Sequence, residues 1–187
     1  MKILITGVRG FVGNNLYLKL KKKNEIIGIG RKNRNYKNKY KNIIEKEITH
    51  KNLVNLNFKP NVIIHCAGSG SVNKSIQNPK IDYEKNVNTT KDLIKFISEL
   101  TKKPKVIMFS TAAVYGNSCE KNKKKLKPIS PYGRNKLKSE NILLKKSKKF
   151  KFELIILRFY SIYGVGLKKQ LIWDACEKIN NKINDFY

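Results

Sequence analysis

A tyrosine and a lysine four residues apart, Tyr132 and Lys136, have the chemistry of a general acid/base pair. Residues 131–146 are predicted to form a helix, on which this spacing brings both side chains to one face. A lysine ammonium beside a phenol favours the phenolate and lowers the tyrosine pKa toward the working pH. Tyr17 and Lys21 have the same spacing, but they lie behind a glycine-rich turn, whereas Tyr132 follows an expected strand. Tyr132 and Lys136 are therefore the candidate catalytic pair.

A second group of residues is suited to binding phosphate. The apolar strand expected at residues 2–6 leads into Thr6-Gly7-Val8-Arg9-Gly10-Phe11-Val12-Gly13, a G-x-x-G-x-x-G arrangement that opens a helix. Glycine at these places permits a tight turn and lets backbone N–H groups approach a pyrophosphate at the positive end of the helix. The residues predicted to bind a dinucleotide here are Gly7, Gly10, Phe11, Val12 and Gly13.

The end of the second expected strand, Ile29-Gly30-Arg31, bears on which dinucleotide is bound. A cofactor with a free 2′-hydroxyl normally meets a carboxylate about 20 residues after the glycines, and no acidic residue stands at this strand end. Gly30 leaves space for a 2′-phosphate, and Arg31 would bind it through a charge-assisted fork, unless Arg31 is simply solvated. NADP is therefore favoured over NAD. Glu47 and Ile48 follow the third strand and either flank the adenine or form an ordinary strand end.

The elements that must position these residues alternate between strand and helix. Strands are expected at residues 2–6, 25–29, 42–45, 61–65, 105–110 and 152–158, and helices at 13–22, 83–100, 131–146 and 170–182. Apolar strands that are each followed by a helix indicate a parallel sheet with helices on both faces. The predicted fold is a doubly wound α/β domain of the Rossmann type over residues 1–187, with its ligand at the carboxyl ends of the strands.

The charge of the chain raises the question of a nucleic-acid partner. Its 187 residues include 41 basic and 13 acidic side chains, which give a net charge of +28. Lysine accounts for 36 of the 41, whereas base and phosphate recognition favours arginine. Lysine and asparagine are spread along the whole chain, so compositional drift explains the charge better than nucleic-acid binding does.

The remaining composition excludes other classes of protein. No apolar stretch approaches the ~20 residues of a membrane span, and the first apolar run ends too early for a leader peptide. The three cysteines, Cys66, Cys119 and Cys176, are odd in number and lack metal-ligand spacing, which predicts a cytoplasmic protein without a metal site. Cys66 is expected to be inert, and His65 is expected to be a hydrogen-bonded core residue.

Six ordered motifs extend over nearly the whole chain. They are the turn at residues 6–13, the segments 62–68, 83–90, 109–116 and 130–136 with Glu140, and the segment 157–164. In this order they resemble the extended short-chain dehydrogenase/reductase family, which includes the NAD-dependent epimerases, dehydratases and reductases of nucleotide sugars. The resemblance implies a nucleotide-diphosphate sugar as substrate and NAD or NADP as cofactor.

The resemblance also implies a role for each matching residue. Tyr132 would exchange the proton of a sugar hydroxyl, Lys136 would bind the nicotinamide ribose, and the Thr111 hydroxyl would orient the reacting oxygen. Hydride would pass between the sugar carbon and the nicotinamide. The further residues that the resemblance places along the cofactor are Cys66, Ala67, Gly68, Asn86, Ser110 and Phe159, with Tyr160 beside Phe159.

Departures from the family pattern narrow the reaction. Sugar 4,6-dehydratases carry an acidic pair directly after the catalytic hydroxyl, because elimination of water needs its own acid and base, and this chain has Ala112-Ala113 there. A 4-epimerase or a 4-ketosugar reductase remains. Arg31 mildly favours the reductase, whereas the serines of residues 71–75 are similar to those of epimerases. Ser161 replaces the asparagine that is common after the sixth strand, which puts a contact to the sugar-nucleotide phosphates in doubt.

Members of this family normally continue past the sixth strand into a smaller carboxyl-terminal substrate lobe. This chain ends just after a helix, so we expect the lobe to be largely absent and turnover to be weak. Two alternatives follow from the same residues: a catalytically weak Rossmann protein that binds nucleic acid through its basic surface, and a homodimer formed through the helices at 83–100 and 131–146.

Overall fold

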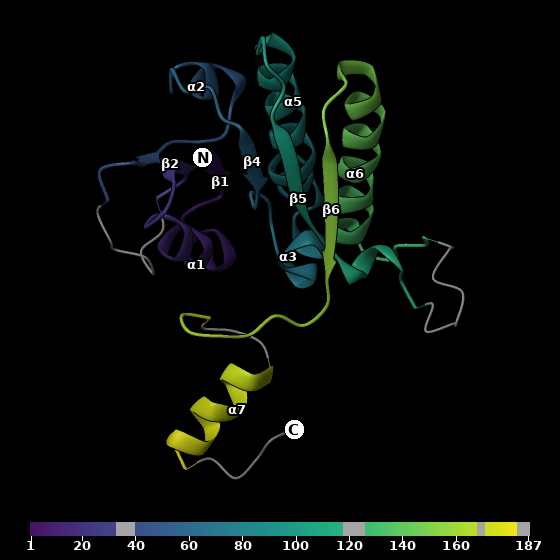
Figure 1. The fold of residues 1–187 in the computed structure, drawn as a ribbon. Coiled ribbons are helices and arrows are strands. Elements are labelled where there is room, and N and C mark those ends of the chain that lie inside the picture. The colour runs from purple at the N-terminus through teal and green to yellow at the C-terminus, as the bar shows by residue number, and fades with distance from the viewer. Residues whose placement is uncertain (33–39, 118–125, 168–170, 183–187) are drawn as a thin grey trace.

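The computed structural model describes residues 1–32, 40–117, 126–167 and 171–182. Its centre is a six-stranded sheet in the order β3-β2-β1-β4-β5-β6, in which all neighbouring strands are parallel (Figure 1). The strands are β1 (Lys2–Thr6), β2 (Glu25–Gly30), β3 (Ile43–Glu45), β4 (Val62–His65), β5 (Lys105–Thr111) and β6 (Leu154–Phe159). The predicted doubly wound α/β fold is confirmed, and all six expected strands are present.

Helices connect these strands. The longer helices are α1 (Phe11–Leu20), α5 (Thr89–Glu99), α6 (Pro131–Phe150) and α7 (Leu171–Asn180). The shorter ones are α2 (His50–Val54), α3 (Val72–Gln77), α4 (Pro79–Tyr83), a π-helical turn η1 (Glu84–Asn88) and a 3₁₀ turn η2 (Ala112–Val114). In Figure 1, α7 lies apart from the sheet, beyond the carboxyl end of β6. Most of the basic segment at residues 121–127 lies outside the described residues.

The central strand β1 shows why helices cover both faces of the sheet. Ile3 and Ile5 belong to an apolar cluster with Tyr17 of α1, whereas Leu4 belongs to a cluster with residues of α5 and α6. Successive side chains of a strand point to opposite faces, so a strand that is apolar throughout must be covered twice. The cover is incomplete at the β6 edge, where Ile155 and Leu157 are each more than one third exposed.

The helix expected at residues 83–100 differs from the prediction. It begins at Pro79, where proline suits the first helical turn, and it passes through the π-helical turn η1 before continuing as α5. The hydroxyls of Thr89 and Thr90 donate to the carbonyls of Lys85 and Asn86, at 2.6 and 2.7 Å. Such turns are mostly single insertions within an α-helix, and this one contains Asn86.

His65, at the end of β4, is the hydrogen-bonded core residue that the sequence predicts. Its Nδ1 lies 2.7 Å from Thr6 Oγ1, its Nε2 lies 3.2 Å from Thr90 Oγ1, and the side chain is 1% exposed. Burial lowers the pKa of His65 to about 3, and the charge of Lys136 contributes to this shift. His65 is therefore neutral in the folded protein at every pH near neutrality.

This low pKa predicts a pH dependence of stability. Between pH 3 and 6.5 the unfolded state binds more protons at His65 than the folded state, so the free energy of unfolding falls as the pH is lowered. From pH 6.5 to 5 the loss from this one group is about 2 kcal/mol. Urea unfolding at several pH values measures it against a His65→Asn variant, which lacks the dependence. A His50→Asn variant serves as the control, and an unchanged slope in His65→Asn contradicts the prediction.

Candidate active site

Two adjoining cavities, of about 800 and 400 Å³, lie along the carboxyl edge of the sheet. They share five residues: Gly7, Gly10, Cys66, Ala67 and Gly68. The larger cavity extends toward the ends of β2 and β3, and the smaller one toward the end of β5 and the start of α6. Together they form one continuous site whose middle is the glycine-rich turn.

Two glycines of the turn are required by its geometry. Gly7 has φ +71°, and a Cβ there would lie 2.7 Å from the backbone of Ala67 on the neighbouring strand end. A Cβ on Gly13 would lie 2.4 Å from the carbonyl oxygen of Gly7. The close packing leaves the first turn of α1, with Gly10 as its N-cap, open toward the smaller cavity. That arrangement suits a pyrophosphate at a helix N-terminus.

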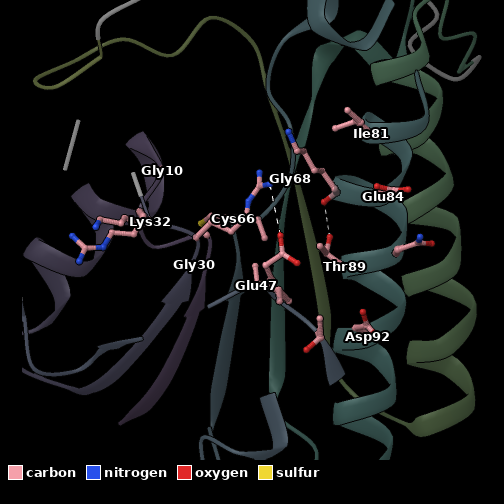
Figure 2. A pocket seen from close by; sticks show the side chains of 18 residues that line it. Gly10, Gly30, Lys32, Glu47, Cys66, Gly68, Ile81, Glu84, Thr89 and Asp92 are labelled. Atoms are coloured by element: carbon pink, nitrogen blue, oxygen red, sulfur yellow. Dashed lines mark hydrogen bonds and ion pairs between the residues drawn. The ribbon is translucent and has the colours of Figure 1, made fainter. Parts of the chain in front are cut away.

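The larger cavity has polar walls of mixed charge. Figure 2 shows Gly30, Lys32 and Glu47 on the side of the β2 and β3 ends, facing α4, η1 and α5 with Ile81, Glu84, Thr89 and Asp92. Arg31 and Glu47 form a wide ion pair, with Nη1 and Oε1 4.0 Å apart and both side chains more than half exposed. Ile48 also lines this wall.

Arg9 is a cavity residue that the sequence reasoning did not select. It lies within the glycine-rich turn, is 6% exposed and forms an ion pair with Glu45 at the end of β3. The variable positions of a glycine motif carry no signal of their own, and the partner lies 36 residues away. The larger cavity therefore has Arg9, Arg31 and Lys32 near the end of β2, with Glu47 as the carboxylate on the same wall.

The smaller cavity brings together the predicted catalytic residues. Ser130 caps α6 by accepting from Gly133 N at 3.0 Å, and the Tyr132 N–H donates to Ser75 Oγ of α3 at 3.1 Å. These contacts fix the first turn of α6 against α3, and the side chains of Thr111, at the end of β5, and of Tyr132 both line the smaller cavity. A phenol held against a hydroxyl beside an open cavity is suited to exchange a proton with a bound alcohol.

Lys136 lies one turn after Tyr132 and is 5% exposed. Its Nζ donates to the carbonyl oxygen of Phe109 at 2.6 Å, and burial lowers its pKa to about 8. The pKa of Tyr132 is raised, mainly by burial and further by Asp82, although the bond with Thr111 opposes the shift. The expectation that Lys136 lowers the pKa of Tyr132 is therefore wrong for this arrangement, because burial raises that pKa and Lys136, bound to Phe109, does not contribute to the shift.

The other predicted cofactor residues are placed as follows. Cys66 has a pKa raised by burial, which agrees with an inert thiol. Phe159 packs on Phe109 with ring centroids 4.9 Å apart and lines the smaller cavity. Ser110 also lines it, although its hydroxyl donates to Glu140. Asn86 reaches neither cavity, because it lies behind Gly68, where a Cβ would lie 2.4 Å from Asn86 Oδ1.

Most of the residues predicted from the sequence therefore border the site. Those on the larger cavity are Gly7, Gly10, Arg31, Glu47, Ile48, Cys66, Ala67 and Gly68. Those on the smaller one include Phe11, Val12, Gly13, Ser110, Thr111, Tyr132, Lys136 and Phe159. In the described part of the chain, no three or more histidine, cysteine, aspartate or glutamate side chains cluster as metal ligands would. No helix there is both long and apolar enough to span a bilayer.

The fold and the site define a Rossmann-type domain of the extended short-chain dehydrogenase/reductase kind, with a glycine-rich turn in the middle of the cavity and a tyrosine–lysine pair at one end. Residues 3–184 match the model of the NAD dependent epimerase/dehydratase family, and the chain belongs to that family.

Several curated and solved proteins are similar. The UDP-glucose epimerase YtcB of Bacillus subtilis is 32% identical over 182 residues, which cover 88% of this chain and 57% of YtcB. A UDP-glucose 4-epimerase of Mycoplasma genitalium is 33% identical over 115 residues, 58% of this chain and 34% of that protein. The UDP-glucuronic acid 4-epimerase of Bacillus cereus, solved with UDP-glucuronic acid and NAD, superposes with a TM-score of 0.86 at 25% identity. That superposition covers 97% of this chain and 63% of the solved one. The chain thus spans between about a third and two thirds of the length of these relatives.

Proposed function

We propose that this chain is the cofactor-binding part of an NAD(P)-dependent enzyme that transfers hydride to and from a nucleotide-diphosphate sugar. The observation that carries the proposal is the continuous cavity, which leads from the glycine-rich turn at Gly7 to the side chains of Thr111, Tyr132 and Lys136. A dinucleotide along this edge would place its nicotinamide between Phe159 and Tyr132. The free thiols of Cys66 and Cys176 support a reducing, cytoplasmic setting.

The side chains divide the chemistry among them. A bound nicotinamide supplies the site that accepts and returns hydride. Tyr132 takes the proton of the sugar hydroxyl during oxidation and returns it during reduction, and Thr111 holds the same oxygen in line with the phenol. Lys136, which retains N–H donors besides the one that binds Phe109, would bind the ribose hydroxyls of the nicotinamide nucleoside. Phe159 excludes water from one side of the reacting atoms.

Two features favour a 4-epimerase among the reactions of the family. Ala112 and Ala113 leave no acid–base pair after Thr111, so a dehydratase lacks its second set of catalytic groups. The similar proteins of B. subtilis, M. genitalium and B. cereus are epimerases of UDP-sugars. A 4-ketosugar reductase is the alternative, and the basic wall around Arg31 is what favours it.

The preference for NADP is tested by comparing how a substitution of Arg31 changes the affinities for NADPH and NADH. Gly30 lies against the glycine-rich turn, since an added Cβ would lie 3.4 Å from the N atoms of Val8 and Arg9, and both Gly30 and Arg31 border the larger cavity. We expect NADPH to bind more tightly than NADH, and Arg31→Gln to weaken NADPH about tenfold while changing NADH less than about twofold. Fluorescence titration measures both affinities. Arg134→Gln, on the exposed side of α6, is the matched control, and an equal loss for both dinucleotides contradicts a 2′-phosphate contact.

The second test concerns turnover by the chain itself. Tyr160 and Tyr163 are more than 60% exposed beyond β6, so little of the described chain encloses a sugar over Tyr132. Because misplacement of a substrate by ~1 Å costs about a hundredfold in rate, we expect UDP-glucose epimerisation below about a hundredth of the rate of a full-length relative. A coupled assay measures it, with Tyr132→Phe as the blank. A rate comparable with that of the full-length enzyme contradicts the prediction, whereas absent cofactor binding contradicts the proposed function itself.

Self-association through the outer faces of α5 and α6 is the third element of the proposal. Tyr83, the last residue of α4, lies beside these faces, with its ring centroid 5.6 Å from Lys91 Nζ of α5 and 4.9 Å from Lys138 Nζ of α6. Two such faces repel each other, and salt screens the repulsion. We therefore expect dimer formation to increase between about 50 and 500 mM salt in sedimentation experiments, and Lys138→Gln to shift the increase to lower salt. A monomer at every salt concentration in both proteins contradicts the homodimer.

A further inference from the structure

The ring of His65, at the end of β4, is hydrogen-bonded at both of its nitrogens to side chains of two other elements. Thr6, whose Oγ1 lies 2.7 Å from Nδ1, directly precedes Gly7 of the glycine-rich turn. Thr90, whose Oγ1 lies 3.2 Å from Nε2, is at the start of α5, just after the π-helical turn η1. All three side chains are at most 1% exposed, so the protein alone sets the direction of each hydrogen bond.

That direction follows from a backbone carbonyl. Thr90 Oγ1 lies 2.7 Å from Asn86 O, and a carbonyl oxygen only accepts, so the single hydroxyl proton of Thr90 is donated to Asn86. Thr90 Oγ1 must then accept from His65, which puts the ring proton on Nε2. A neutral imidazole has one N–H, so Nδ1 accepts the hydroxyl proton of Thr6. One tautomer is therefore compatible with all the contacts of the ring.

Ser139 extends this series of hydrogen bonds to α6. Its Oγ donates to Asn86 O at 3.1 Å and to Asn135 O at 2.9 Å, and Ser139 follows Lys136 by three residues. The carbonyl of Asn86, within the π-helical turn, thus accepts from both α5 and α6. A connected series of buried groups runs from the residue before Gly7 to the helix that carries the acid/base pair.

The same ring adjoins the residues that line both cavities. Residues 66–68 directly follow His65, and Gly7 directly follows the threonine that binds Nδ1. Gly68 in turn packs on the π-helical turn, since an added Cβ would lie 2.4 Å from Asn86 Oδ1. A displacement of the ring would therefore move the wall at the middle of the site, where the two cavities meet.

We propose that His65 is a positioning residue of the dinucleotide site, whose ring, with its proton on Nε2, joins the glycine-rich turn to the π-helical turn and to α6. The inference rests on the proposed function of this edge as an NAD(P) site. A dinucleotide with or without a 2′-phosphate would pass the middle of the site, so loss of either link weakens NADPH and NADH alike. That pattern differs from the one expected for Arg31, which acts on NADPH.

Two substitutions separate the two links. The side-chain amide of asparagine takes the place of Nδ1 and that of glutamine the place of Nε2, so His65→Asn retains a partner for Thr6 and His65→Gln one for Thr90. We expect each to weaken both dinucleotides about fivefold in fluorescence titrations of the folded proteins. Leu53→Ala is the matched control, because Leu53 is fully buried in α2 and lines neither cavity. It lowers stability and leaves both affinities unchanged.

The tautomer is measured separately, in the protein without cofactor, by ¹⁵N NMR of the histidine rings, with His65→Asn used for assignment. A proton on Nε2 is expected, and a proton on Nδ1 overturns the inference. Unchanged affinities in both folded His65 variants overturn it as well, and so does an equal loss in Leu53→Ala. Where neither His65 variant folds, Thr6→Val, which replaces the donating hydroxyl by a methyl group, is titrated with the same expected loss. Wild-type protein that binds neither dinucleotide contradicts the proposed function instead, and the tautomer is still measured.

Discussion

The contact between Gly7 and Ala67 is the constraint on which the rest of the site depends. The Gly7 N–H donates to Ile29 O at 2.8 Å, and its Cα packs so closely on the end of β4 that any side chain would overlap with Ala67. The ends of β1, β2 and β4 are thereby joined at one point. Since the strands are parallel, everything that follows them emerges at the same edge, and the two cavities meet where the three ends meet.

Helix α6 performs the corresponding role at the other end of the site. Tyr132, Lys136 and Glu140 follow one another at four-residue spacing and face the ends of β5 and β6, where Lys136 binds Phe109 and Glu140 binds Arg158. The carboxylate of Glu140 is fully buried, and a buried ion pair adds little net stability over apolar residues. The ion pair of Glu140 and Arg158 instead constrains geometry. Separation of the two partners would leave a buried charge uncompensated, and the pair therefore holds α6 in its position along β6. Tyr132 and Lys136, which lie on the same helix, are thereby held at the end of β5.

The sequence was sufficient for the fold and for most of the site, because both depend on local patterns. Apolar strands that are each followed by a helix fold into a doubly wound parallel sheet. The glycines at 7, 10 and 13 lie where a strand is followed directly by a helix. The missing parts depend on contacts between distant segments. The position of Arg9 depends on its ion pair with Glu45, and that of Asp82 depends on its hydrogen bond with Asn135. The π-helical turn around Asn86 depends on the packing of that helix on α6. The direction of the Tyr132 pKa shift was wrong for the same reason, since spacing on a helix shows which groups are neighbours but not how deeply they are buried.

Burial also explains how a chain with a net charge of +28 retains an intact site. Among the described residues, Arg9 and Lys136 are the buried basic side chains, and Asp82 and Glu140 the buried acidic ones. Lysine on a solvated surface changes stability little, so composition drifts there with small cost. A charge removed from water requires a partner of opposite sign or a neutralising shift in pKa, and such a requirement fixes the residue type. Physical chemistry therefore constrains the residue type at these few buried charged positions, and they line or support the same cavity.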